Sequence, residues 1–486
     1  MNPSIARRGL LKGVVGAAVL GFDPLRRSWI SVAEAGQGHG RPQPLPRLDG
    51  RLTTDPATLA ECADDFGHIV SRAPRAVLQP GSIQDIVEMV RYVRRAGLKI
   101  AMRGQGHQTD GQAQVDDGVV IDSRALNRIE AVGAGGVWVE AGTTWRALTD
   151  KTIAAGFTPP AMTNYLDLSV GGTLSAAGVS GASHRNGAQI DNVLELEVVT
   201  GRGELQRCSP SRNGGLFQAV LGGLGQFGLI VRAKLKLERA PALVRLYTLD
   251  YDTTDPFFAD MKRVALDRRF HHVEAQLVPQ TDGSWKPSVM AVAYFDPGSP
   301  PNDARLLAGL AHTAAAQMDL PYQAFLARLD PITELQKQLG VWGFPHPWFD
   351  VFLPAWATPT YVEDVLSTLT VADTGNGPVL LYPLRRSTHR HPFFRIPRSD
   401  EVFYLFDILR TTAPDPAAVQ AQVAANRALY EQAKDMDGSR YCIGTIPFTQ
   451  RDWKEHYGPT WLLFVAAKLA YDPQNVLTPG QGIFSY

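Results

Sequence analysis

Residues 103–112 read RGQGHQTDGQ and directly follow a predicted strand, Lys99–Met102. Gly104, Gly106 and Gly111 can take positive φ angles and allow close backbone approach, so that successive N–H groups can turn toward one point. Such a concavity of donors suits a phosphate. One imidazole, that of His107, lies in the middle of the loop. A tight loop with an incidental polar histidine is the alternative that this loop alone leaves open.

A second group of Gly and Ser residues lies further along the chain. It comprises residues 169–175, SVGGTLS, and residues 178–181, GVSG. Predicted strands separate it from the first loop, so simple turns do not account for both groups. Together the two groups predict a long ligand that carries a diphosphate and lies along one domain.

A third glycine group, residues 223–228, reads GLGQFG and matches the pattern GxGxxG. In a Rossmann fold this pattern follows a strand and opens a helix, whose N-terminus then meets the pyrophosphate. Here the order is reversed, because residues 216–221 are predicted to be helical and residues 230–237 to form a strand. The pattern therefore does not indicate a nicotinamide site.

The composition limits the class of protein. The chain has 486 residues, 48 Lys and Arg against 48 Asp and Glu, and 44% hydrophobic residues. At roughly 100–200 residues per domain this length predicts two to four domains, and the composition argues against disorder and coiled coil. A net charge of zero removes the simplest case for nucleic-acid binding. The three widely spaced cysteines, Cys62, Cys208 and Cys442, indicate buried, inert thiols.

Hydrophobic periodicity divides the chain into two regions. Over 71–240 we expect one α+β unit, with a helix over 82–97 capped by Ser82 and with Asp85 in a capping-box position. This unit also contains a helix over 145–155 and a hairpin over 194–208. Over 245–440 we expect a second domain, with strands at 289–295 and 379–384 and helices at 303–317 and 417–434. We find no internal repeats.

The amino terminus has the pattern of an export signal. Arg7 and Arg8 precede Gly-Leu-Leu-Lys and a short apolar run, Val14–Leu20, and residues 33–35, AEA, offer a cleavage site. The run is shorter than a membrane span, and no later segment resembles one. Residues 1–35 are therefore predicted to be a twin-arginine signal peptide, with ordinary secretory export or a basic soluble helix as alternatives. The prediction places the mature protein in the periplasm or outside the cell.

These motifs, taken together, resemble one family. The chain is similar to FAD-linked oxidoreductases of the vanillyl-alcohol oxidase, or PCMH-type, superfamily, and most of all to the cytokinin dehydrogenases. The resemblance covers most of the chain from about residue 70 and is thin between 280 and 440. It is carried by residues 104–107 with 111–113, 169–175, 178–181, 192–196 with 199–201, 221–228, Trp453, 456–458, Trp461, 471–473, 477–481 and 483–484.

The resemblance implies an α+β fold with two parts. A PCMH-type FAD-binding domain of two subdomains would carry a substrate-binding cap, in which helices cover an antiparallel sheet. The implied boundaries are a lead-in over 36–70, the FAD-binding domain over 71–245, the cap over 246–440, and a C-terminal segment, 441–486, that returns to the FAD-binding domain.

The resemblance also implies FAD bonded covalently to the protein. His107 stands where the family's histidine bonds to the 8-methyl group of the flavin, and no cysteine lies in 178–187 to form a second link. The residues implied to contact the cofactor are Gly104, Gly106, His107, Gln108, Gln112, Ser169, Ser175, Val179, Ile230, Tyr441, Thr478 and Gln481. Gln108 and Thr478 replace serines that are usual in the family.

The implied substrate site departs from the family at two places. Asn164 stands where the cytokinin enzymes carry an Asp that accepts a hydrogen bond from the substrate amine, and an amide cannot ionise. Glu274 matches the family's glutamate at the pocket entrance. Arg385 and Arg386 follow Tyr382-Pro383-Leu384 where the family usually has Asn, so they suit either an anionic substrate group or solvated surface. The histidines at 271–272 and 389–391 lack the spacing of a metal site.

These inferences predict an exported FAD-dependent oxidoreductase that oxidises a C–N bond of an amine by hydride transfer to flavin. Oxygen or another acceptor would reoxidise it, the substrate would be a small molecule, and no nucleic acid, membrane span or metal is expected. Two alternatives stay open. One is an oxidase or dehydrogenase of an alcohol, sugar or hydroxy acid on the same scaffold, and the other is a flavin-binding protein that has lost its catalytic base.

Overall fold

The first sheet of the domain expected to bind FAD contains the predicted strand at 99–102 and packs against the predicted helix over 82–97. The computed structural model describes residues 19–23, 28–31 and 43–484. The sheet has the order β4-β5-β7-β6, with β5, β6 and β7 parallel and β4 antiparallel. Its strands and helices are β4 (Arg51–Thr53), α1 (Pro56–Cys62), β5 (Ala76–Gln79), α2 (Ile83–Ala96), β6 (Ile100–Arg103) and β7 (Val119–Asp122).

The helix α2 begins and ends where the sequence predicts. The hydroxyl of Ser82 accepts a hydrogen bond from the backbone N–H of Asp85, and Gly97 ends the helix in the left-handed conformation. The carboxylate of Asp85 does not return to Ser82, as a capping box would require. It accepts instead from the backbone N–H groups of Asp49, Gly50 and Gly81, each at 2.8 Å. Asp85 thereby ties the chain before β4 to the start of α2.

The second sheet is fully antiparallel, in the order β11-β10-β12-β8. Helices between its strands include α4, which borders the cavity described below, and α6, which precedes β12. The predicted order of helix and strand around residues 223–228 is therefore confirmed. The bounds are β8 (Val137–Glu140), α3 (Trp145–Ala154), β9 (Phe157–Thr158), α4 (Val170–Ala176), α5 (Ser183–Asn186), β10 (Val193–Thr200), β11 (Leu205–Cys208), α6 (Gly214–Val220), β12 (Gly228–Leu235) and β13 (Glu238–Arg239).

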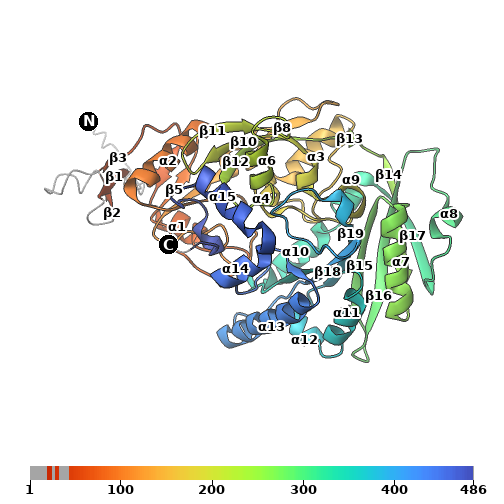
Figure 1. The fold of residues 1–486 in the computed structure, drawn as a ribbon. Coiled ribbons are helices and arrows are strands. Elements are labelled where there is room, and N and C mark those ends of the chain that lie inside the picture. Colours follow the sequence, from red (N-terminus) through yellow and green to blue (C-terminus); the bar gives the residue numbers. More distant parts are fainter. Residues whose placement is uncertain (1–18, 24–27, 32–42, 485–486) are drawn as a thin grey trace, which may run out of the picture.

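The cap is an eight-stranded antiparallel sheet with the order β17-β14-β16-β15-β19-β20-β18-β21. Helices α7, α11 and α13 lie on one of its faces, from the right-hand side to the bottom of the molecule in Figure 1. The bounds are β14 (Leu243–Asp250), α7 (Thr254–Asp267), β15 (His272–Pro279), β16 (Trp285–Phe295), α8 (Asp303–Leu307), β17 (Ala314–Pro321), α9 (Tyr322–Leu326), α10 (Asp330–Gln338), β18 (Phe349–Pro354), α11 (Thr358–Leu366), α12 (Val371–Thr374), β19 (Val379–Arg385), β20 (Val402–Ile408), α13 (Pro416–Asp435) and β21 (Ser439–Arg440).

Side chains alternate between the two faces of the cap sheet, as the period of a strand requires. Val379 and Leu381 of β19 pack in the core beneath the helices. Tyr382 and Leu384 pack in the core shared with the FAD-binding domain. The cap thus turns a second, more polar face toward the FAD-binding domain, and that face carries Glu274 and Tyr382.

The C-terminal segment returns to the FAD-binding domain, as predicted. It contains α14 (Gln450–Tyr457) and α15 (Trp461–Tyr471). Leu477 forms a parallel bridge with Ile100, and the backbone N–H of Thr478 donates to the carbonyl of Ile100 at 2.8 Å. Lys468 of α15, which is buried, donates to the carbonyl oxygen of Gln226 at 3.0 Å. Segments far apart in sequence therefore complete one domain. The predicted α+β class, with two subdomains and a cap, is confirmed.

Three local expectations need correction or comment. The helix predicted over 303–317 is wrong beyond Leu307, because residues 314–321 form β17 and pair with β14. The predicted lead-in over 36–70 contains β4 and α1, so part of it belongs to the FAD-binding domain.

The paired arginines and the cleavage site of the predicted signal lie outside the described residues. Within 1–35 the described parts form β1 (Val19–Asp23) and β2 (Ser28–Ser31), and Trp29 stacks on Tyr92 of α2.

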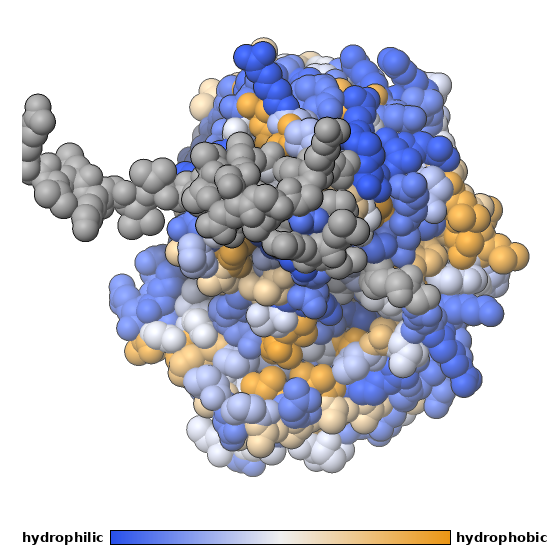
Figure 2. Space-filling model, turned by 90° about the vertical axis from the view of Figure 1, so that its left-hand side faces the viewer, coloured by the Kyte–Doolittle hydropathy of each residue, from blue (hydrophilic) through white to orange (hydrophobic). Residues whose placement is uncertain are grey.

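The three cysteines are free and buried, as predicted. Burial raises the pKa of Cys62 to about 11 and that of Cys208 to about 12. The face of the molecule in Figure 2 is mainly hydrophilic, with apolar side chains in scattered groups. Within the described residues no helix is both long and apolar enough to cross a membrane.

Candidate functional site

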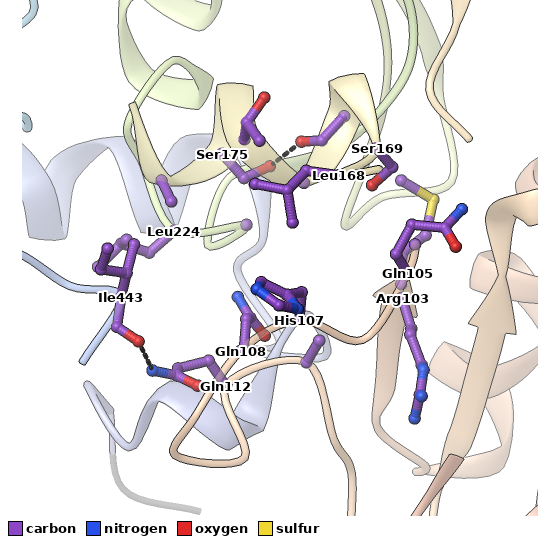
Figure 3. Close-up of a pocket in the computed structure, with 18 of the residues that line it drawn as sticks. Arg103, Gln105, His107, Gln108, Gln112, Leu168, Ser169, Ser175, Leu224 and Ile443 are labelled. Atoms are coloured by element: carbon purple, nitrogen blue, oxygen red, sulfur yellow. Dashed lines mark hydrogen bonds between the residues drawn. The ribbon is translucent and has the colours of Figure 1, made fainter. Parts of the chain in front are cut away.

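A large cavity lies where the two sheets of the FAD-binding domain, the cap and the C-terminal segment meet. It encloses about 1180 Å³, its open mouth included. Loop 103–112, helix α4, the turn before β12, Trp348 of the cap and the C-terminal segment all contribute to its lining. Figure 3 shows His107 near the centre of this lining, with Ser169 and Ser175 on one side and Gln108, Gln112 and Ile443 on the other.

The loop 103–112 needs glycine at two positions for its approach to neighbouring groups. Gly106 has a φ of +68°, and a Cβ there would lie 2.2 Å from the guanidinium of Arg103. A Cβ at Gly104 would lie 2.0 Å from Oγ of Ser169, so only glycine lets the loop approach the start of α4. The side chain of Arg103 points away from the cavity (Figure 3) and donates to the carbonyl oxygens of Glu61 and Asp64.

His107 is half-buried among aromatic rings and lines the cavity. Its ring stacks on Phe66, with centroids 4.0 Å apart, and Tyr165 lies on another side at 4.8 Å. Burial, and next to it the neighbouring His346, lower the pKa of His107 to about 3. The imidazole is therefore neutral at physiological pH and has an unprotonated ring nitrogen.

The cavity fits FAD on the evidence of its unpaired polar atoms. Within the described residues, Oε1 of Gln108 and Oε1 of Gln481 are buried acceptors without a hydrogen-bond partner, and both residues line the cavity. A flavin and its ribityl chain carry N–H and O–H donors that such acceptors can bind. Leu224 and Thr478, also in the lining, have positive φ angles of 55° and 47°. Strain of this kind gathers at ligand sites because the surrounding fold must enforce it.

The structure brings the predicted cofactor residues together with one exception. Val179 does not line the cavity; its backbone N–H donates to the hydroxyl of Tyr441, which does, at 3.4 Å. The predicted residues that line the cavity are Gly104, Gly106, His107, Gln108, Gln112, Ser169, Ser175, Ile230, Tyr441, Thr478 and Gln481.

Sequence reasoning missed several residues around the cavity. Leu224, Gly225 and Gly228 of the GxGxxG pattern line it, although the pattern does not form a Rossmann turn. Trp348 and Ile443 line it as well. For Leu224, Gly225 and Gly228, the glycine pattern before a predicted strand could have indicated the cavity. No local motif marks Trp348 or Phe66.

Asn164 and Glu274 meet beside the cavity. Nδ2 of Asn164 donates to Oε2 of Glu274 at 2.7 Å and to the hydroxyl of Tyr382 at 3.0 Å. Neither Asn164 nor Glu274 lines the cavity itself, but Thr163, next to Asn164, does. These contacts use both hydrogens of the amide, and Oδ1 is left buried without a partner among the described residues.

Glu274 is held as a carboxylate by its neighbours. Burial would raise the pKa of Glu274, but Arg328, at 3.2 Å, and Nε2 of His272, at 2.9 Å, outweigh it and lower this pKa to about 2. A carboxylate accepts hydrogen bonds only, so the amide of Asn164 must turn its NH₂ group toward Glu274. The ionised Glu274 thereby fixes Oδ1 of Asn164 as a free acceptor. Arg328, which supplies the cation, was not identified from the sequence.

Arg385 and Arg386 are not brought to the cavity. The guanidinium of Arg385 pairs with Glu401 at 3.2 Å. Arg386 is exposed, and its Nε donates to the carbonyl oxygen of Asp400 at 3.2 Å. The geometry thus gives neither arginine a contact with a ligand in the cavity. Among the described residues no group of three His, Cys, Asp or Glu side chains could hold a metal ion.

Comparison with known proteins agrees with this geometry. Residues 74–209 match the family model "FAD binding domain", and residues 304–484 match "Cytokinin dehydrogenase 1, FAD and cytokinin binding". The chain is 37% identical over 436 residues to a Rhodococcoides fascians protein named "Uncharacterized oxidoreductase ORF5 in fasciation locus", which covers 89% of this chain and 99% of the relative. It is 33% identical over 487 residues to cytokinin dehydrogenase 9 of Oryza sativa subsp. japonica, which covers 90% of this chain and 91% of the relative. It is 32% identical over 485 residues to cytokinin dehydrogenase 1 of Arabidopsis thaliana, which covers 90% and 83%.

Proposed function

Because the chain belongs to the cytokinin dehydrogenase family of FAD-linked oxidoreductases, we propose that it oxidises a C–N bond of a small amine and holds FAD covalently through His107. The observation that carries this proposal is a neutral imidazole at the centre of a cavity whose unpaired acceptors suit a flavin. The bound flavin would accept a hydride from the carbon next to the amine nitrogen.

The tether would form at a ring nitrogen of His107. The new bond joins this nitrogen to the 8-methyl carbon of the flavin, and the imidazole N–H and one methyl C–H bond are lost. The two electrons released would pass to the flavin and then to oxygen or another acceptor. Gln108 and Gln481 would accept hydrogen bonds from the cofactor, while Ser169 and Ser175 line the part of the cavity formed by α4.

Asn164 would orient the substrate. Its fixed Oδ1 can accept a hydrogen bond from an amine N–H, but the amide cannot take the proton away. An alcohol, sugar or hydroxy acid offers an O–H donor to the same oxygen, so this substrate class is the second candidate. Glu274, which stays ionised and fully engaged by its donors, positions Asn164 rather than acting as a base.

Acid denaturation tests the cofactor and its tether. We expect acid-precipitated wild-type protein to keep a yellow, fluorescent chromophore, and His107→Ala protein to release it into the supernatant. Release of all flavin from the wild-type chain would refute the covalent bond, while FAD released intact would still support the FAD site.

A substrate panel separates the substrate classes. Anaerobic bleaching of the flavin band near roughly 450 nm reports the hydride transfer. We expect bleaching by amines such as isoprenoid adenines. Bleaching by alcohols, sugars or hydroxy acids alone would favour the second candidate. A flavin that stays oxidised with every compound would identify a flavin-binding protein without catalysis.

We also propose that the protein is exported through the twin-arginine signal in residues 1–35. The support is the sequence pattern of Arg7-Arg8, the apolar run and the small residues at 33–35. We expect the wild-type chain outside the cytoplasm and an Arg7→Lys/Arg8→Lys chain to accumulate inside, with the flavin bound in both. Equal distribution of the two proteins would contradict this route.

A further inference from the structure

His107 belongs to a stack of three rings. The centroids of His107 and Phe66 are 4.0 Å apart with planes inclined by 27°, and those of Phe66 and His346 are 3.9 Å apart and inclined by 19°. Phe66 and His346 are buried, with 9% and 4% of their surface exposed. Phe66 thus lies between the cavity histidine and a second histidine that comes from the cap.

The backbone fixes the relative positions of these rings. The N–H groups of Phe66 and Gly67 donate to the carbonyl oxygens of Gly106 and Gln108, at 2.8 and 3.0 Å, on either side of His107. The carboxylate of Asp65 accepts from the N–H groups of Gly67 and Gly111, at 3.0 and 2.7 Å. The segment 65–67 therefore holds the loop 106–111 along its length.

The outer histidine is fixed in turn. The backbone N–H of His346 donates to the carbonyl of Gly67 at 2.9 Å, and Nδ1 lies 3.0 Å from the carbonyl oxygen of Phe66. A carbonyl only accepts, so Nδ1 of His346 carries the proton. Burial, which lowers the pKa of His346 to about 4, keeps the ring neutral. This ring can therefore stay against Phe66 over the physiological pH range.

Among the described residues no other aromatic ring lies as close to the imidazole of His107 as Phe66. Within the described residues no hydrogen bond to either of its ring nitrogens is found. Tyr165 lies further away at 4.8 Å, and Trp348 meets the ring edge-on at 5.7 Å. A histidine that must act through one ring nitrogen is commonly held by a hydrogen bond at the other. Here a stacked ring takes that place and leaves both nitrogens free.

We propose that Phe66, backed by His346, is a positioning residue for flavin attachment: it holds His107 in the orientation from which its ring nitrogen bonds to the 8-methyl carbon. The inference rests on the covalent attachment proposed above and adds the residue that prepares the nucleophile. It assigns no contact between Phe66 and the substrate.

The test compares Phe66→Leu with Phe257→Leu, which removes another buried ring, in α7, far along the chain from the loop. Full-length protein produced without flavin is mixed with FAD, and total bound flavin and acid-stable flavin are followed with time. We expect both variants to bind FAD, and Phe66→Leu to form acid-stable flavin about tenfold more slowly, the scale expected from losing stacked aromatic contacts. Phe257→Leu should match the wild type, and Phe66→Tyr, which keeps the ring, should restore the wild-type rate.

The possible outcomes separate this inference from the proposed function. Acid-stable flavin that forms in Phe66→Leu as fast as in the wild type overturns the role of Phe66 and leaves the tether intact. Wild-type protein without acid-stable flavin overturns both. If Phe66→Leu does not fold, His346→Leu removes the outer ring instead; slower attachment at unchanged FAD binding then supports the inference, and an unchanged rate contradicts it.

Discussion

The amide of Asn164 contacts an ionised carboxylate, that of Glu274. Its Nδ2 is 2.7 Å from a carboxylate whose pKa is lowered to about 2. An aspartate at this position would place two carboxyl groups within hydrogen-bond distance. Two such groups cannot both ionise at little cost, so they would share a proton and titrate as a pair. The amide of Asn164 has no such repulsion with Glu274, and it cannot act as a base.

Asn164→Asp is therefore expected to add a base and a new pH dependence. The introduced carboxyl group forms a titrating pair with Glu274. At a pH above the pKa of this pair, an amine should reduce the flavin about 10²-fold faster than in the wild type. This factor is the lower end of what a positioned base supplies. Because the ionised form is the active one, this rate should rise with pH and then level off. Stopped-flow flavin reduction between pH 5 and pH 9 measures both effects.

The control at this position is Asn164→Ala, which removes the acceptor and leaves Glu274 with one donor fewer. It should reduce flavin more slowly than the wild type at every pH. If Asn164→Asp is no faster than Asn164→Ala across the range, the side chain does not lie at the reacting nitrogen.

At the scale of residues, eleven of the twelve cofactor residues expected from the sequence line the cavity, but the residues that support it were not expected. Gly104, His107 and Ser169 lie in short motifs whose residue types are dictated by close approach and hydrogen bonding, and such constraints are visible locally. Phe66, Arg328 and Trp348 act through partners far along the chain. Their residue types are ordinary for a core or a surface, so no local pattern distinguishes them.

Among the elements, the pair of strands β18 and β20 carries an unusual charge arrangement. Asp350 and Asp407 lie directly opposite each other and are both buried. Burial raises the pKa of Asp350 to about 7, although Arg440 acts against it, and burial and the neighbouring Asp350 raise that of Asp407 well above its usual range. The folded protein therefore binds protons here that the unfolded chain has already released.

This arrangement predicts that stability falls as pH rises. In the unfolded chain Asp350 ionises near its ordinary pKa of 3.8, whereas in the folded protein it does so near 7. The stabilising contribution is complete below 3.8 and is lost as pH rises through about 7. Asp350→Asn should thus be more stable than the wild type at pH 8, and this difference should shrink as the pH falls toward 5. Thermal denaturation between pH 5 and pH 8 should give a flatter pH dependence for the variant.

The exposed Asp364 of α11 provides the matched control, since Asp364→Asn makes the same chemical change at the surface. It should leave the pH dependence of the wild type unaltered. Parallel curves for Asp350→Asn and the wild type would show that Asp350 does not titrate in this range.

The elements that the sequence predicted correctly are those whose local signals agree with their tertiary partners. Ser82 and Gly97 mark the ends of α2, and the apolar period fixes its buried face. The helix prediction over 303–317 is wrong beyond Leu307. The alanines of this segment favour a helix locally, but residues 314–321 pair with β14. Strand pairing with a distant segment overrides such a propensity and leaves no trace in a short window of sequence.

At the scale of the whole molecule, the cavity lies at the interface between separate parts of the chain. Its lining comes from the first sheet, from α4 and the turn before β12, from the cap at Trp348, and from the segment 441–481. A ligand that contacts all of these stabilises their association, because it binds the folded arrangement and not the unfolded chain. The family resemblance predicted that these segments meet around one ligand. Hydrophobic periodicity alone did not predict it, because it describes each segment separately.

The proposed tether, together with the position of the cavity between these parts of the chain, predicts how FAD affects thermal stability. A reversible ligand stabilises by about 2.7 kcal/mol at a hundred times its Kd, and the effect disappears when the ligand is removed. In His107→Ala protein the Tm should therefore rise with added FAD and fall again after desalting. In the wild-type protein, loaded and tethered, the Tm should be the same before and after desalting and should not respond to added FAD. His312→Ala, in the loop before β17, should behave like the wild type. Differential scanning calorimetry of the three proteins, with flavin absorbance recorded for each sample, makes the comparison. If desalting lowers both the Tm and the flavin absorbance of the wild-type protein, FAD is bound reversibly and not covalently.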